Sequence, residues 1–189
     1  MPRPPVRRLL APAVVACALL AVPGAAAAAA APCANADLMP TAANGPRVRA
    51  ATLCLLNGER TSRGLRALRH DGQLRKVAQG YSREMVHQRF FDHVGRDGST
   101  LAGRVRARTT YLRSAGYWSL GENLYWGTGE RGTPRESVDG WMHSSGHRHN
   151  ILNPDFRDIG IGIAIGAPED VDGEPAATYT TEFGARTSR

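Results

Sequence analysis

Residues 121–162 decide the fold, because they contain GENLY (121–125), WMHSSGHRHN (141–150) and IGIG (159–162) in that order. From Ile159 to Ile165, isoleucine alternates with glycine or alanine, and this period of two predicts a strand with one face of small residues. Asp172-Gly173 predicts a turn that leads to a partner strand at 177–183. Because helical patterns come first and these antiparallel strands last, we predict an α+β fold.

The segments before this stretch have helical spacing. Asp71 is a good N-cap, and Thr133-Pro134 followed by Glu136 is a strong helix start. Ser144, Ser145 and Gly146 are expected to end the last helix before His147. The pattern predicts helices over residues 48–62, 71–90, 100–116 and 133–144, and a further strand over 117–126.

The N-terminal residues have the composition of an export signal. A positive start is followed by an apolar run over 9–22, a Pro-Gly break and an alanine run. The run is shorter than the roughly 20 residues that cross a bilayer, so we interpret residues 1–31 as a secretory signal peptide. A retained anchor, a lipidated Cys17 and twin-arginine rather than Sec export are the alternatives. Residues 32–46 are then an N-terminal arm and residues 47–189 the folded domain.

Charge and hydropathy exclude some classes of partner. The formal net charge is +7, and removal of Arg3, Arg7 and Arg8 with the signal leaves +4. This modest balance, without a basic helix interleaved with aromatics, does not indicate nucleic-acid binding. No long apolar run follows Val22, so no transmembrane segment is expected after signal removal. The oligomeric state is not predicted.

Two cysteines remain after signal removal, Cys33 and Cys54. An even pair in an oxidising compartment favours a disulfide, which would tie the arm to the first helix. Two free thiols are the alternative.

The separated motifs, in this order, resemble the bacterial branch of the CAP superfamily (cysteine-rich secretory protein, antigen 5 and pathogenesis-related 1; SCP-like, PR-1-like). The similarity covers roughly residues 48–184 and implies a three-layer α-β-α sandwich with a small antiparallel sheet. It also implies a cleft with two histidines and two acids. His93, Glu122 and His147 match three of them, whereas Ser144 stands where many eukaryotic members have the second glutamate.

The resemblance places His93, Glu122 and His147 in one cleft, with Asn123 and Ser144 beside them. Two imidazoles and a carboxylate are a common ligand set for zinc with one open position, so we hypothesise a divalent-cation site there. Without metal, Glu122 could orient an imidazole that acts as a general base. The alternative is a hydrogen-bonded network that only fastens loops together.

Two functions follow as expectations. The first is a secreted module that binds a lipid or other small amphiphile, a cation or a cell-wall component. The second is an extracellular hydrolase acting on peptides or peptidoglycan through Glu122, His93 and His147, although no complete catalytic motif is present. A purely structural surface protein is the third interpretation. The pattern has no His-Glu-x-x-His motif, nucleophile elbow or phosphate-binding loop.

Overall fold

The computed structural model describes Met1 and residues 32–188. The predicted signal peptide, including Cys17, lies outside the described residues apart from Met1. The elements in chain order are α1 (Gly45–Thr61), β1 (Arg69–His70), α2 (Gly72–Gln88), α3 (Leu101–Arg108), β2 (Ala115–Thr128), the 3₁₀ turn η1 (Gly129–Gly132), α4 (Pro134–His143), α5 (Ser145–Leu152), β3 (Asp158–Ile165) and β4 (Ala176–Ser188).

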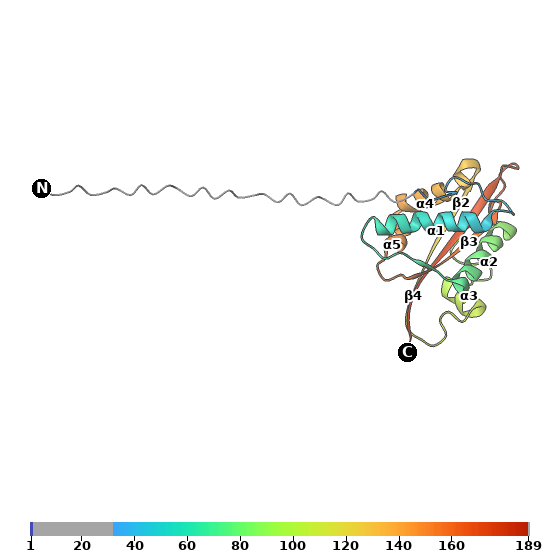
Figure 1. Ribbon diagram of the computed structural model, residues 1–189. Helices are drawn as coiled ribbons and strands as arrows, with labels where there is room; N and C mark the ends of the chain where they lie inside the picture. The colour runs from blue at the N-terminus through green and yellow to red at the C-terminus, as the bar shows by residue number, and fades with distance from the viewer. Residues whose placement is uncertain (2–31, 189) are drawn as a thin grey trace. The chain divides into compact units, whose positions relative to one another are not determined.

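The helices form two layers with the sheet between them (Figure 1). Helices α1, α4 and α5 contact one another and bury Leu56, Trp141 and Ile151 against strand residues such as Tyr179. On the other face, α2 and α3 bury a second set of apolar side chains, including Leu74. The predicted α+β class and three-layer arrangement are therefore confirmed.

The sheet has the strand order β1-β3-β4-β2 within the described residues. Strand β4 pairs antiparallel with both β2 and β3, as predicted for the C-terminal hairpin. Strand β1 pairs parallel with β3 through only two residues, Arg69 and His70. The predicted antiparallel strands β2, β3 and β4 are thus present, and the short parallel strand β1, which the sequence pattern did not show, makes the sheet mixed.

The predicted end of one helix was wrong, and so was the expected loop position of His147. Helix α3 stops at Arg108 rather than Gly116, because Thr109 is extended and its hydroxyl donates to the Val105 carbonyl at 2.7 Å. Helix α4 does end at His143, but Ser144 is then the N-cap of α5. His147 therefore lies on a helix and not in the loop that the Ser-Ser-Gly sequence suggested.

The arm is fastened to the helical layer that contains α1. Cys33 and Cys54 form the predicted disulfide. Asp37 accepts hydrogen bonds from the Arg135 guanidinium of α4, at 2.5 Å and 2.9 Å, and Ala36 is buried. Within the described residues, no helix has the length and apolar character needed to cross a bilayer.

Glycines of β3 set the distance between the sheet and α2. A Cβ atom on Gly160 would come within 2.1 Å of the α2 backbone at Leu74 and Arg75, and one on Gly162 within 2.2 Å of Ala78. The face of small residues that the alternating pattern predicted therefore allows α2 to contact the strand backbone directly.

Candidate functional site

His93 and Glu122 form a pair at the β2 edge of the sheet. The His93 Nδ1 atom lies 2.8 Å from the Glu122 Oε1 atom. The imidazole is 56% exposed, whereas the Glu122 side chain is only 4% exposed. The pair therefore presents an imidazole to solvent and holds it from behind with a buried carboxylate.

Arg104 of α3 fixes this pair in place. Its guanidinium donates to the Glu122 Oε2 atom and to the backbone carbonyls of His93 and Ser99, at 3.1 Å and 3.0 Å. It also stacks 3.4 Å from the ring centroid of Tyr81, whose hydroxyl donates to the Asp92 carbonyl. One buried cation thus neutralises Glu122 and shapes the loop that carries His93.

The Gly-Glu-Asn motif serves both faces of β2. Successive side chains point to opposite faces of a strand, so Glu122 faces Arg104 while Asn123 faces α5. The Asn123 amide donates to the His147 carbonyl at 3.0 Å, and Asn150 donates to the Glu122 carbonyl and the Asn123 Oδ1 atom. Gly121 leaves room for this packing, because its Cβ would lie 3.0 Å from the Asn150 Oδ1 atom.

A depression of about 280 Å³ lies beside His147, between β2 and α4. Phe91, Tyr125, Trp126 and Ser144 also line it. Phe91 comes from the same loop as His93, two residues before it, and is 45% exposed. The two aromatics at the start of β2, Tyr117 and Trp118, do not line the depression and are exposed elsewhere.

The arrangement does not fit a zinc ion. In the described part of the chain, no group of three His, Cys, Asp or Glu side chains is placed to hold a metal. Both oxygens of Glu122 are engaged, one by His93 and one by the Arg104 guanidinium. His147 belongs to α5, which contacts the opposite face of β2, although its ring is near enough to His93 for the charge of His93 to affect its pKa. A cation at Glu122 would have to share that carboxylate with Arg104 and His93, so no chemistry is derived through metal here.

The pKa values of His93 and His147 are shifted in opposite directions. The hydrogen bond to Glu122 raises the pKa of His93 above its ordinary value, despite partial burial. Burial lowers the pKa of His147, and the nearby charge of His93 lowers it further. These shifts favour the cationic, donating form of the ring at His93 and the neutral imidazole at His147.

Glu182 is a second acid at this site. It is fully buried on β4 and lies directly opposite Glu122 in the strand register. As a carboxylate it would have no hydrogen-bond donor on either oxygen among the described residues. Burial first, and then the charge of Glu122, raise its pKa well above the ordinary range, which favours the neutral acid at this position.

Sequence reasoning missed both Arg104 and Glu182. Arg104 follows Leu101 by three residues and precedes Val105, so its helical position on the buried face was a usable signal. Glu182 interrupts a strand of threonines and aromatics that is covered on both faces, and that was the corresponding signal. His143 and His149, which neighbour His147 in the sequence, are exposed.

The fold and the His-Glu cleft define a CAP-type domain. The model of the cysteine-rich secretory protein family, CAP, matches residues 53–181. The chain belongs to this family, as the sequence motifs predicted.

Two proteins of Bacillus subtilis are similar to part of this chain. The chain is 39% identical over 108 residues to the uncharacterized protein YkwD of Bacillus subtilis, covering 57% of this chain and 39% of that protein. It is 31% identical over 111 residues to the uncharacterized membrane protein YlbC of the same organism, covering 59% of this chain and 30% of that protein. The chain thus matches well under half the length of these relatives.

Solved structures share the fold. An outer surface protein of Borrelia burgdorferi superposes with a TM-score of 0.56 at 23% identity, covering 70% of this chain and 88% of that protein. An extracellular protein with an SCP domain from Bacillus anthracis has a TM-score of 0.55 at 24% identity, covering 75% of this chain and 43% of that protein. At these identities the likeness establishes architecture alone.

Proposed function

We propose that this protein is an extracellular binding module whose ligand, a cell-wall component, docks at the cleft between His93 and His147. The observation that carries the proposal is the His93–Glu122 pair, in which a 56% exposed imidazole is held by a 4% exposed carboxylate. A buried charged side chain that orients one exposed side chain is typical of a binding or catalytic site. The signal peptide predicted from the sequence supports a location outside the cell.

The local chemistry favours a wall component over a cation or a lipid. A cation has to compete with Arg104 for Glu122. The depression of about 280 Å³ is smaller than the roughly 300–1,000 Å³ of sites that enclose a small molecule. It is better suited to hold one sugar ring or one peptide side chain of a larger ligand against Phe91, Tyr125 and Trp126.

The two imidazoles give the cleft a defined polarity. Because His93 uses Nδ1 for Glu122, its Nε2 atom remains available to a ligand, and in the protonated ring that the raised pKa favours this Nε2–H donates to a ligand oxygen. His147, with its lowered pKa, supplies a neutral ring that can accept a hydrogen bond. A ligand with an acceptor and a donor on neighbouring atoms, such as a glycan hydroxyl next to an amide, satisfies both.

The second candidate function is hydrolysis of peptides or peptidoglycan. It is favoured by the same pair, because a carboxylate bonded to one imidazole nitrogen is an arrangement that general bases use. Ser144 replaces the second cleft acid of the family pattern, and Glu182 is fully buried and cannot reach a substrate. The residues thus provide a base without an exposed partner acid, and binding is the better-supported function.

The test is co-sedimentation of the protein with purified wall sacculi, with release of soluble fragments measured in parallel. We expect retention without release, at least tenfold weaker retention in His93→Ala and Glu122→Gln, and unchanged retention in His149→Ala, which removes an exposed imidazole of α5. Fragment release that is lost in Glu122→Gln would establish the hydrolase instead. Equal retention of all variants would show that wall binding does not use the cleft, and no retention with no release would leave the domain a structural surface protein.

A further inference from the structure

A groove follows the outer edge of β3, across the sheet from the His93 cleft. It consists of two cavities of about 590 Å³ and 280 Å³ that share Pro46 and Arg49 of α1. We call it the edge groove. Its floor is the edge of β3 from Ile161 to Ile165, and its walls are α1 and α2. The larger cavity falls within the volume range of ligand sites.

The edge of β3 in this groove has no neighbouring strand in the described part of the chain. Strand β1 covers β3 only at Asp158 and Ile159. The Asp71 N–H donates to the Ile159 carbonyl, so the backbone of Ile159 faces away from β4. With the period of two, Ile161, Ile163 and Ile165 direct their backbone groups the same way.

Gln79 of α2 occupies the position of a missing strand residue. Its amide nitrogen donates to the Ile163 carbonyl at 2.7 Å, and its amide oxygen accepts from the Ile163 N–H at 3.3 Å. One carboxamide therefore makes both bonds that a residue of an added strand would make. Two residues further along, Ile165 is 51% exposed at the open end of the groove.

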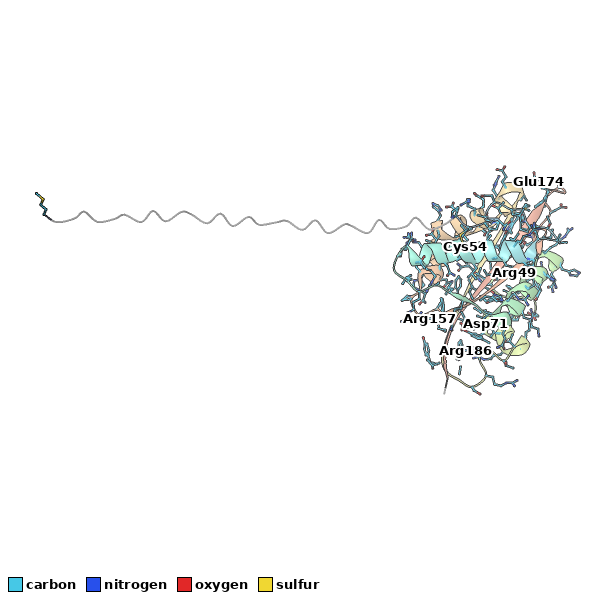
Figure 2. The ribbon with its side chains drawn as sticks, in the orientation of Figure 1. Arg49, Cys54, Asp71, Arg157, Glu174 and Arg186 are labelled. Carbon is cyan, nitrogen blue, oxygen red and sulfur yellow. A yellow bond between two sulfur atoms is a disulfide. The ribbon has the colours of Figure 1, made fainter. Side chains whose placement is uncertain are left out.

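The charged side chains that line the edge groove are all basic. Arg49, Arg75 and Arg83 line it together with His70 and His87, and no Asp or Glu lines either cavity. None of the three arginines forms an ion pair with a described residue. Burial lowers the pKa of Arg49, and the charge of Arg75 lowers it further. Figure 2 labels Arg49 near the start of α1, where that helix passes α2.

We propose that the edge groove binds an extended acidic peptide segment of another protein, which adds a strand beside β3. Strand addition supplies main-chain bonds to an exposed sheet edge, and side chains at alternate positions supply specificity. Acidic side chains of the peptide then meet Arg49, Arg75 and Arg83. The aliphatic side chains Val86 and Ile165 receive the apolar residues between them.

Gln79 has a specific role in this proposal. Because its carboxamide already bonds to Ile163, the incoming backbone has to displace it. Gln79 covers the edge when no peptide is present, which also protects it from unwanted strand pairing. Its removal should therefore strengthen peptide binding, whereas the removal of an ordinary contact residue would weaken it.

The experiment measures fluorescence anisotropy of a labelled pool of hexapeptides in which Glu or Asp alternates with Val, Ile or Thr. We expect saturable binding that weakens with added salt, because exposed charges are screened over about 10 Å at 0.1 M. The variant Arg49→Gln/Arg83→Glu should bind at least tenfold more weakly. Arg66→Glu and Arg113→Glu, which change exposed arginines outside the groove, should stay within twofold, and Gln79→Ala should bind several-fold more tightly.

A second pool with N-methyl groups on alternate amides separates strand addition from other modes, and it uses the unaltered protein. We expect at least tenfold weaker binding, because N-methylation removes the donors that meet β3. Equal binding of the two pools would overturn the proposal. So would the absence of binding, or binding of dodecanoate at the same arginines with no peptide binding, which would make the groove an amphiphile site.

Discussion

The two outer edges of the sheet differ in how their charged side chains are paired. At the β2 edge, the acid Glu122 lies beneath the surface and is matched by Arg104 and His93. At the β3 edge, three arginines surround a groove that contains no acid. At the first edge the charge of Glu122 is paired within the fold, and one oriented imidazole is exposed. The second has unbalanced charge and an uncovered strand.

The difference predicts which mutations should affect folding and which should affect only binding. Removal of a residue at the β2 edge leaves a buried partner without compensation, so mutations there should affect folding as much as binding. At the β3 edge the cations are partly exposed and unpaired, so changes there should affect binding and leave stability nearly unchanged. Each prediction below tests this contrast.

The largest expected effect is that of Arg104→Met. The substitution keeps much of the side-chain volume but leaves Glu122 buried beside Glu182 without its cation. The free energy of unfolding should fall by about 3–5 kcal/mol, as is typical when one partner of a buried ion pair is removed. Urea denaturation measures it, with Arg83→Met at the β3 edge as the matched control, which should change by less than about 0.5 kcal/mol. Similar small losses in both variants would contradict the contrast.

Most of the fold could be predicted from local patterns. The hairpin of β3 and β4, the N-caps Asp71 and Thr133 and the disulfide all follow from short-range signals in the sequence. Strand β1 could not be predicted, because two residues carry no period. The end of α3 was missed because Thr109 could have continued a helix, and its hydroxyl bond to Val105 became visible only in the structure.

The candidate site was predicted only in part. His93 and Glu122 could be assigned from motifs, and they do meet. Their neutralisation by Arg104 depends on how α3 crosses β2, and the pairing with Glu182 depends on strand register. Both are long-range features that no single segment contains. The ligand set of the zinc hypothesis left out Arg104 for the same reason, since the cation that pairs with Glu122 comes from a distant helix.

The second effect concerns how α2 is held against β3. A Cβ on Gly162 would lie 2.2 Å from the Ala78 carbonyl carbon, so Gly162→Ala must push α2 outward. We expect a loss of about 1–3 kcal/mol in the free energy of unfolding, the usual range for overpacking. Gly146→Ala on α5, where a Cβ has open space, is the control and should not destabilise. A neutral Gly162→Ala would show that α2 does not set the width of the edge groove.

The third prediction is a gain in stability, whereas the first two are losses. Burial raises the pKa of Glu182 in the folded state, so the folded chain keeps this proton up to a higher pH than the unfolded chain does. Its contribution to stability is fully present below the unfolded pKa and is lost as the pH rises through the folded pKa. Glu182→Gln should therefore stabilise the protein by roughly 1 kcal/mol at pH 8 and have little effect at pH 4. Thermal melts at both pH values measure it.

The control for this prediction is Glu169→Gln, an exposed acid, which should change the melting temperature little at either pH. Glu122→Gln should destabilise, since it removes the charge that balances Arg104. Loss of stability at pH 8 in Glu182→Gln would mean that Glu182 is ionised in the folded state and has a donor that compensates it.

The smallest effect tests how the β2 edge orients its imidazole. The hydrogen bond from His93 to Glu122 is the main cause of the raised pKa of His93, so Glu122→Gln should lower that pKa toward its ordinary value. NMR titration of the ring protons measures the change, and Glu59→Gln on α1 is the distant control. The stability that this pair contributes is present below the unfolded pKa of histidine and is lost as the pH rises through the raised value. Because His93 is more than half exposed, this contribution is small, and the titration is a more sensitive test than a melting curve. An unchanged pKa of His93 in Glu122→Gln would mean that the carboxylate positions the loop but does not favour the protonated ring. The proposal that His93 donates a hydrogen bond to the ligand would then lose its support.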